Sequence, residues 1–217
     1  FSMNIALIIA RAGSKRIKNK NIKSFYGKPI IAYSIIAALK SKIFKRVIVS
    51  TENNKIINIS KNFGAEIPFI RPKRLADDKT STFKVIKHAI KILKLKKSDN
   101  LCCIYPVSPN VKKTLLQSTL KILLNKKADF VFPVAKKINV NKPLYINTNG
   151  YIRKTKLKKK NFLTDTGQFY WGKVRSFINF SNIFSGKSIG FKVPKEIFLD
   201  VNYMRDWRKL VQSFKKW

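Results

Sequence analysis

The chain opens with the stretch Asn4–Lys23, NIALIIARAGSKRIKNKNIK. Its first part, Asn4–Ala10, is an apolar run of strand length, which is typical of a buried β-strand. The run leads directly into Arg11–Lys23, a basic loop that contains Gly13 and Ser14. A glycine lets backbone N–H groups turn toward an anion, and the cations and the hydroxyl can bind phosphate oxygens. The stretch therefore predicts a phosphate-binding loop at the carboxyl end of the first strand.

The strand-then-helix pattern recurs further along the chain. Apolar runs of strand length are Asn4–Ala10, Val47–Ser50, Leu101–Tyr105 and Phe130–Val134. Stretches with helical period are Ile30–Leu39, Asn53–Phe63, which ends at Gly64, Thr82–Leu95 and Thr114–Leu124. Such alternation is typical of an α/β fold with a mostly parallel, Rossmann-like sheet that is flanked by helices. Ligands of these sheets bind beyond the carboxyl ends of the strands, where the basic loop lies.

A small excursion from the sheet is expected after its fifth strand, at about residues 135–165, because the apolar runs there become shorter. Asn149-Gly150 predicts a hairpin turn within the excursion. The chain returns with the predicted strands Gly167–Trp171 and Ile189–Val193. It ends in an amphipathic helix, whose apolar face comprises Met204, Trp207, Leu210, Val211 and Phe214.

Length and composition predict one domain over residues 3–217. The 217 residues are 45% hydrophobic, which is enough for one substantial core. We expect Met3 to be the native start, with Phe1 and Ser2 added for expression. No apolar run approaches the roughly 18 residues that a membrane span needs, and Ile5–Ala10 is too short for the core of a signal peptide. We therefore expect a cytoplasmic protein that does not contact the membrane.

Cysteine and histidine are scarce in this chain. The two cysteines, Cys102 and Cys103, are adjacent in a predicted strand, so their side chains should point to opposite faces. This arrangement excludes a disulfide framework and argues against a zinc site. The one histidine, His88, is interpreted as a partly buried helix residue rather than a catalytic one.

The net charge of +37, from 47 Lys and Arg residues against 10 Asp and Glu residues, raises the alternative of a nucleic-acid or anionic-membrane partner. The lysines are spread through nearly every segment. The densest run, Lys154–Lys160, contains no aromatic side chains that could stack on bases. This distribution favours solvated surfaces and argues against nucleic acid, although a basic nucleic-acid-binding module stays the alternative outside the enzymes.

The basic loop matches neither G-x-G-x-x-G nor G-x-x-x-x-G-K-[ST], which argues against a dinucleotide fold and a P-loop NTPase. Instead, Ile9–Lys23 resembles the signature that opens the acylneuraminate cytidylyltransferase family. The resemblance continues in register through the first half of the chain. The matching segments are Gly27–Ile30, Ala32–Ile35, Val47–Thr51, Gly64–Glu66, Arg71-Pro72 and Leu75–Asp78. Two later segments, Cys102–Pro106 and Asp165–Gly172, are more similar to the pseudaminate branch than to the sialate branch.

The resemblance implies an enzyme that uses CTP and an acidic nine-carbon sugar. The reaction would join the anomeric hydroxyl of a nonulosonic acid to the α-phosphorus of CTP and release pyrophosphate. Pseudaminic acid is the first-choice sugar. CMP-sialate or CMP-legionaminate synthesis is the alternative within the enzyme class, and an inactive or weakened family member is another. The resemblance also implies a homodimer built from the excursion. No residue qualifies as a convincing general base.

The resemblance also implies roles for individual residues. Arg11 and Lys20 would act on the triphosphate as the catalytic cations. The nucleotide would be bound by Ala10, Arg11, Gly13, Ser14, Asn21 and Arg71, with Arg71 near the cytosine. The sugar would contact Tyr105, Gln168 and Tyr170.

Mg²⁺ is the cofactor that the resemblance implies. The family carries an Asp-x-Asp pair before the last helix to hold the metal, and this chain has Asp200-Val201-Asn202. Asp200 and Asn202 are the implied ligands, because Mg²⁺ prefers hard oxygen donors. The alternative for Asn202 is the N-cap of the final helix. A second departure is Lys158–Leu163, which replaces a Gln-Asp-containing stretch of the family and leaves the sugar specificity open.

Overall fold

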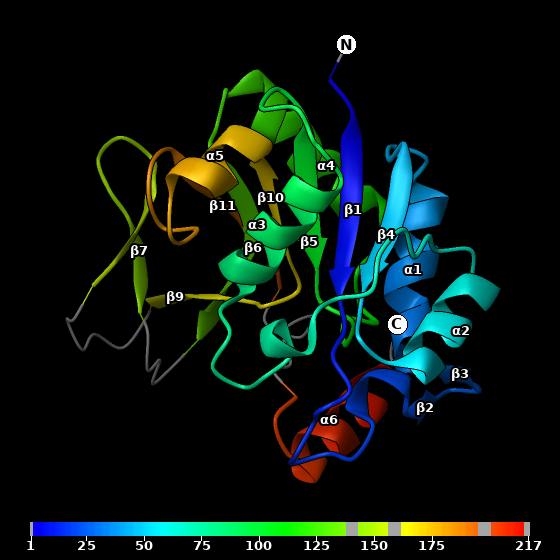
Figure 1. Cartoon of the computed structure of the whole chain (residues 1–217). Coiled ribbons are helices and arrows are strands. Elements are labelled where there is room, and N and C mark those ends of the chain that lie inside the picture. Colours follow the sequence, from blue (N-terminus) through cyan, green and yellow to red (C-terminus); the bar gives the residue numbers. More distant parts are fainter. Residues whose placement is uncertain (1, 138–142, 156–161, 195–200, 215–217) are drawn as a thin grey trace.

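The computed structural model describes residues 2–137, 143–155, 162–194 and 201–214 (Figure 1). Its strands are β1 (Asn4–Ile9), β2 (Ser24–Phe25), β3 (Lys28–Pro29), β4 (Arg46–Ser50), β5 (Asn100–Ile104), β6 (Phe130–Lys137), β7 (Leu144–Ile146), β8 (Ile152–Lys154), β9 (Phe162–Asp165), β10 (Phe169–Lys173) and β11 (Ser188–Lys192). Its helices are α1 (Ile30–Ser41), α2 (Asn54–Asn62), α3 (Thr82–Ile92), α4 (Lys113–Asn125), α5 (Val174–Asn179) and α6 (Met204–Phe214), with 3₁₀ turns η1 (Lys20–Ile22) and η2 (Lys73–Leu75). The α/β class is confirmed.

The strands of the large sheet run in the order β4-β1-β5-β10-β6-β9-β7-β8, and β11 also pairs with β6. β1 is parallel to β4 and β5, with Ile5 opposite Arg46 and Leu101. β10 inserts between β5 and β6 and is antiparallel to both, and the pairings of β9 with β6 and of β7 with β9 and β8 are antiparallel too. The prediction of a mostly parallel sheet is therefore wrong, because the described sheet is mixed and largely antiparallel. Periodicity predicts which strand residues are buried, whereas long-range pairing decides strand direction.

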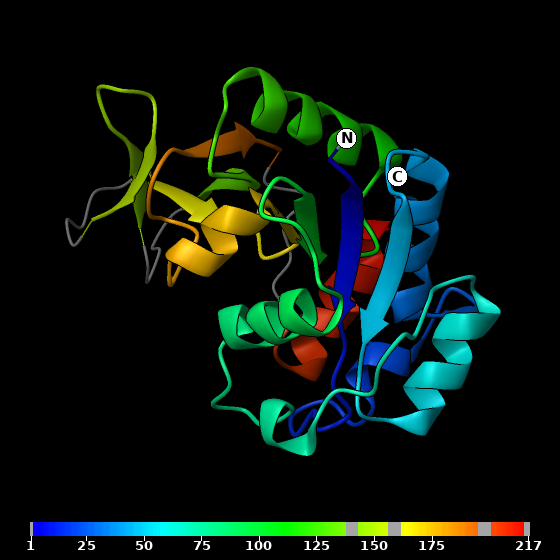
Figure 2. The same ribbon diagram turned by 45° about the horizontal axis from the view of Figure 1, so that its top comes forward.

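Helices cover both faces of the sheet, as expected. Figure 2 shows α4 on one side of the sheet and α3 on the other. Ile35 of α1 and Leu116 of α4 belong to the core on the first face, and Phe177 of α5 belongs to the core on the second. Cys102 and Cys103 lie in opposite cores and both thiols are free, which confirms the expected alternation. Burial raises the pKa of both thiols, so they stay protonated and inert.

Polar side chains begin two of these helices at the expected places. Asn53 accepts the N–H of Ile56 at 3.1 Å before α2, and Ser81 accepts the N–H of Lys84 at 3.3 Å before α3. Such caps contribute about 1 kcal/mol each to helix stability. Gly64 follows α2 with a φ of 89°, a conformation that costs glycine little because it has no Cβ.

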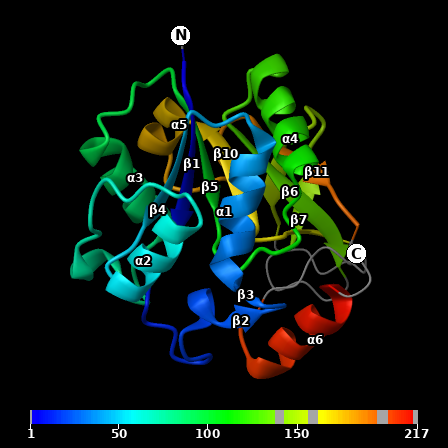
Figure 3. The same ribbon diagram turned by 90° about the vertical axis from the view of Figure 1, so that its right-hand side faces the viewer.

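The last helix packs against the first loop of the chain at the carboxyl edge of the sheet (Figure 3). The rings of Trp207 and Phe214 in α6 meet the Phe25 ring edge-on, at centroid distances of 5.8 and 5.0 Å. The Tyr26 hydroxyl donates to the Val211 carbonyl at 2.7 Å. Aromatic pairs of this kind are worth about 0.5–1.5 kcal/mol beyond their burial. The helix therefore holds the segment that follows the basic loop.

The segment at about residues 135–165, which the sequence predicts to leave the sheet, instead extends it: β9, β7 and β8 continue the sheet beyond β6 (Figure 1). In its β7-β8 hairpin, the Asn147 N–H donates to the Tyr151 carbonyl at 2.9 Å and Gly150 has a φ of 77°. The hairpin predicted at Asn149-Gly150 is thus confirmed. Most of the lysine-rich run lies outside the described residues. In the part of the chain that the structure covers, none of the helices has both the length and the apolar character that a membrane crossing requires.

Gly172 of β10 lies where two buried aromatic rings approach the backbone. A Cβ at this position would lie 2.7 Å from Phe177 and 2.8 Å from Phe130, and both rings are fully buried. We expect Gly172→Ala to lower the free energy of unfolding by about 1–3 kcal/mol, because a packed core does not shift to admit a methyl group without strain. Denaturant unfolding measures the change. An unchanged midpoint and slope would contradict this packing.

Candidate active site

A cavity of about 300 Å³ lies beyond the carboxyl ends of β1 and β5. It is lined by the loops that follow these strands, the segment from Arg71 to the first turn of α3, the turn before β10, Val201 ahead of α6 and Leu210 within α6. Predicted site residues on its wall are Arg11, Ser14, Lys20, Asn21, Arg71, Tyr105 and Gln168. The cavity volume lies at the small end of the range for ligand pockets. The fold therefore brings most of the predicted site residues to one place.

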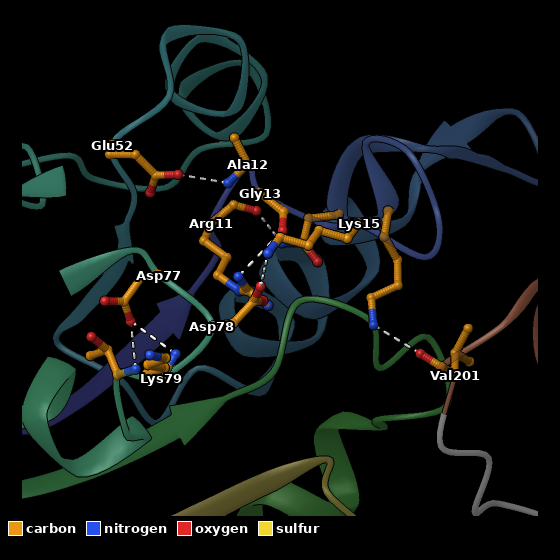
Figure 4. Close-up of polar contacts among 12 residues, drawn as sticks. Arg11, Ala12, Gly13, Lys15, Glu52, Asp77, Asp78, Lys79 and Val201 are labelled. Carbon is orange, nitrogen blue, oxygen red and sulfur yellow. Dashed lines mark hydrogen bonds and ion pairs between the residues drawn. The ribbon is translucent and has the colours of Figure 1, made fainter. Parts of the chain in front are cut away.

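Arg11 and Lys20 of the loop after β1 line this cavity, and Figure 4 shows Arg11 and Lys15 of the same loop beside Asp78. Arg11 Nη2 lies 2.5 Å from Asp78 Oδ1, and Lys15 Nζ lies 3.0 Å from Asp78 Oδ2. Arg11 Nη1 also donates to the Gly13 carbonyl at 3.3 Å. Hydrogen bonds from Lys15 and Arg11 hold the pKa of the Asp78 carboxyl below its usual range, so this group is ionised at neutral pH. The two cations thus already bind an anionic group.

Hydrogen bonds within the chain hold the same loop in shape. The buried Asn21 side chain donates from Nδ2 to the Arg11 carbonyl at 2.8 Å. Lys20 Nζ donates to the Val201 carbonyl at 2.8 Å and so joins the loop to the segment before α6 (Figure 4). The Asn21 and Lys20 side chains both donate to backbone carbonyl oxygens, so these two hydrogen bonds do not depend on the identity of the accepting residue. Asn21 and Lys20 therefore support the loop as well as line the cavity.

Glu52, which follows β4, is a site residue that the sequence analysis missed. Its Oε1 accepts the Ala12 N–H at 2.7 Å, and its Oε2 accepts from Arg71 Nη2 at 3.2 Å. The Arg71 side chain is only 3% exposed and that of Glu52 only 13%. Burial lowers the pKa of the Arg71 guanidinium, and the charge of Glu52 opposes that shift. Glu52 therefore links the buried Arg71 to the backbone of the basic loop.

Tyr105, which follows β5, belongs to a network of hydroxyl groups. Its hydroxyl lies 2.8 Å from Thr82 Oγ1, and its ring meets the Tyr170 ring edge-on at 5.6 Å. The Tyr170 hydroxyl donates to Asp165 Oδ2 at 2.5 Å. Burial is the main cause that raises the pKa of both tyrosines, so they remain neutral at physiological pH. Tyr105 and Thr82 line the cavity, whereas Tyr170 lies in the core behind them.

Other predicted site residues lie off the cavity wall. Ala10 is fully buried, and its N–H donates to the Ser50 carbonyl at 3.0 Å. Gly13 is exposed in the basic loop. Asp200 lies outside the described residues. Any part that Ala10 and Gly13 play in nucleotide binding must come from their backbone groups.

Asn202 lines a neighbouring hollow of about 440 Å³, together with cations of the basic loop. Helix α6 begins at Met204, so Tyr203 rather than Asn202 occupies its N-cap position. Asp206 in the first turn accepts the N–H groups of Asn202 at 3.0 Å and Tyr203 at 2.8 Å. The described residues contain no group of three or more His, Cys, Asp or Glu side chains that could hold a metal ion.

His88 lies half-buried on α3, away from the main cavity, as the sequence predicts. Its ring meets the Phe69 ring at a centroid distance of 5.5 Å. Burial, followed by the charges of Arg74 and Arg71, lowers its pKa. The imidazole is therefore neutral at pH 7.

Asp78, Thr82 and the loop residues Ser108 and Asn110 also line the cavity, although the sequence analysis gave them no role. Their position in the sequence could have identified them, because each lies in a segment that follows a predicted strand or precedes a predicted helix. Glu52 carried the same signal, directly after the second predicted strand. Residue type alone did not distinguish these polar groups from those of ordinary surface loops.

Comparison with known proteins identifies relatives over nearly the whole chain. A family model described as cytidylyltransferase matches residues 5–198. The chain is 33% identical to pseudaminic acid cytidylyltransferase of Campylobacter jejuni, over 94% of this chain and 92% of the relative. It is 32% identical to a longer Helicobacter pylori protein, which is named for the same activity and for a UDP-sugar hydrolase, over 98% of this chain and 43% of the relative.

A solved structure of CMP:2-keto-3-deoxy-manno-octonic acid synthetase complexed with CTP has the same fold. Its TM-score is 0.77 over 99% of both chains, at 15% sequence identity. At this identity the likeness shows the fold and no more. The family model and the long matches to relatives carry the assignment: this chain belongs to the cytidylyltransferase family.

Proposed function

We propose that this chain transfers CMP from CTP to the anomeric hydroxyl of pseudaminic acid and releases pyrophosphate. The observation that carries the proposal is the cavity at the carboxyl ends of the parallel strands, where the cations of the basic loop meet the buried Arg71. The match over 92% of a relative that is named for pseudaminic acid favours this sugar over sialic or legionaminic acid. The sugar carboxylate and the triphosphate are both anions that a basic cavity attracts.

In this reaction the sugar oxygen bonds to the α-phosphorus of CTP as the bond from that phosphorus to the pyrophosphate oxygen breaks, and the proton of the sugar hydroxyl passes to solvent. Arg11 and Lys20 stabilise the negative charge on the phosphates, and Ser14 donates a hydrogen bond to them. Arg71, which hydrogen-bonds to Glu52, contacts the cytosine in this proposal. Donors fixed in advance supply most of the catalysis in transfers of this type, because little covalent work falls to the protein.

Tyr105 and Gln168 contact the sugar in this proposal, and Tyr170 supports Tyr105 from the core. The raised pKa of Tyr105 keeps its hydroxyl neutral, so it donates a hydrogen bond and does not remove a proton at neutral pH. The carboxyls of Asp77 and Asp78 have a lowered pKa and are weak bases. We therefore assign no general base among the described residues.

A divalent metal is typical of this family, and we propose Mg²⁺. Asn202 suits this ion, because an amide side chain carries a hard oxygen donor and the residue lines the hollow beside the basic loop. Asn202 and Asp200, the latter outside the described residues, would hold the ion. When bound, Mg²⁺ neutralises charge on the phosphates.

We also propose that the chain is a single domain that forms a homodimer through the excursion. Tyr145 and Ile146 of β7 support this, because these large apolar side chains are exposed on that part of the sheet. Light scattering of the purified protein measures the mass in solution and tests the dimer.

Substrate choice tests the proposed function directly. Pyrophosphate release from CTP should be on the order of 10²-fold faster with pseudaminic acid than with sialic or legionaminic acid, because mismatched polar groups are left unpaired in the sugar site. The rate with CTP should likewise exceed the rates with UTP, ATP and GTP, because a mismatched base also leaves polar groups of its site unpaired. Equal rates among the sugars would contradict the pseudaminate assignment. Equal rates among the four nucleotides would contradict a site that reads cytosine.

Arg11→Ala should reduce kcat on the order of 10²-fold, the usual cost of losing one positioned electrostatic donor. Arg46→Ala is a matched control, because the Arg46 side chain is similarly exposed (31% against 34% for Arg11) and also pairs with a carboxylate. Arg46 begins β4, so it lies at the amino end of the strand and not at the carboxyl end, where the cavity is. Steady-state kinetics of both variants measure the difference. Similar rates for the two variants would remove Arg11 from the mechanism.

Asn202→Asp should lower the half-saturating Mg²⁺ concentration several-fold, because a carboxylate adds a negative charge to the metal site. The rate as a function of Mg²⁺ concentration measures this shift. Asn149→Asp makes the same chemical change in the distant hairpin turn and should leave the curve unchanged. The metal role of Asn202 is rejected when the two variants give the same curve as the unaltered chain.

A further inference from the structure

The carboxylate of Asp78 occupies the position where the cations of the basic loop meet. Asp78 Oδ1 binds Arg11 at 2.5 Å and Asp78 Oδ2 binds Lys15 at 3.0 Å. The residue lines both the main cavity and the neighbouring hollow. Its side chain is 43% exposed, so solvent and a ligand can reach it.

A carboxylate and a phosphate group compete for the same donors. Both are anions with oxygens that accept charge-assisted hydrogen bonds from guanidinium and ammonium groups. A phosphate oxygen cannot take the place of Asp78 Oδ1 on Arg11 Nη2 while that carboxylate stays there. If the carboxylate remained close by, its charge would repel the phosphate. Either way, Asp78 opposes phosphate binding at these two cations.

The segment that carries Asp78 is held by its neighbours. Asp77 Oδ1 accepts the N–H of Lys79 at 3.0 Å and the N–H of Thr80 at 2.6 Å (Figure 4). The Thr80 hydroxyl donates to the Arg74 carbonyl at 3.3 Å. The backbone of this turn therefore does not depend on the ion pairs of Asp78, and the Asp78 side chain can leave the cations without unfolding it.

We infer that Asp78 is an internal competitor for the phosphate site, which positions Arg11 and Lys15 while the cavity is empty and promotes the release of pyrophosphate. This inference rests on the proposed function, in which pyrophosphate is the leaving product. Asp78 is a positioning residue, because it acts through the two cations and not on the reacting atoms. Its consequence is that removal of the carboxylate strengthens the binding of phosphates.

The test is the direct binding of inorganic pyrophosphate to the full chain, measured by calorimetry at fixed ionic strength. Asp78→Asn should bind pyrophosphate about three- to ten-fold more tightly, the range expected when partly exposed ion pairs no longer compete. Glu66→Gln is the matched control, because Glu66 is 45% exposed and pairs with Arg46 away from the cavity. Its pyrophosphate affinity should equal that of the unaltered chain. Unchanged or weaker binding by Asp78→Asn overturns the inference.

A second variant separates competition from a general effect of charge. In a chain that carries Lys15→Met, the replacement Asp78→Asn should increase pyrophosphate affinity by a smaller factor, because only Arg11 is then released. An equal factor in both backgrounds would mean that Asp78 acts at long range, and it would overturn the inference. The Lys15 side chain is 84% exposed, so its replacement does not disturb the core.

Pyrophosphate binding requires neither CTP nor the sugar, so the two proposals fail separately. Tighter binding by Asp78→Asn without any turnover of pseudaminic acid supports the role of Asp78 and rejects the proposed sugar. Turnover of pseudaminic acid with unchanged pyrophosphate binding rejects the role of Asp78 alone. Product inhibition by pyrophosphate provides a kinetic check, because its inhibition constant should fall by the same factor as the dissociation constant.

Discussion

The parallel pairing of β1 with β4 and β5 is the constraint on which the rest of the site depends. Parallel strands end at the same edge of a sheet, so the basic loop, Glu52 and Tyr105 emerge side by side although they are far apart in the sequence. These strands are buried on both faces, as is typical of parallel strands covered by helices, and Ile8, Val49 and Ile104 are fully buried in the core on one of them.

Acidic side chains at the carboxyl edge of the sheet form ion pairs with cations of the site. The chain has only 10 acidic residues against 47 basic ones, yet Asp77 and Asp78 line the cavity and Glu52 binds Arg71 on its wall. Glu52 is nearly buried and stabilises a guanidinium that would otherwise be desolvated without a partner. Asp78 is exposed and its ion pairs are weak enough to exchange for a phosphate. Glu52 is thus a permanent partner of Arg71 because it is nearly buried, whereas the exposed Asp78 is an exchangeable partner of Arg11 and Lys15.

The antiparallel part of the sheet supplies the other wall of the cavity. β10 inserts between β5 and β6, and the turn before it carries Gln168 to the loop after β5, where the Tyr105 N–H donates to the Gln168 carbonyl at 2.9 Å. The insertion also places Tyr170 behind Tyr105. The half with parallel strands, where we propose that the nucleotide binds, is therefore joined to a half that differs in topology, and the proposed sugar contacts lie at the junction.

The sequence by itself determined the elements of the fold and the chemistry of the basic loop, because periodicity, caps and glycines act over a few neighbouring residues. It predicted the strands that became β1, β4, β5 and β6 and the final helix, and it placed Arg11 and Lys20 at a strand end. Only the tertiary structure decided the antiparallel insertion of β10, the burial of Arg71 against Glu52 and the pairing of Asp78 with two loop cations. These features depend on contacts between distant segments, and no local pattern encodes which carboxylate meets which cation once the chain is packed.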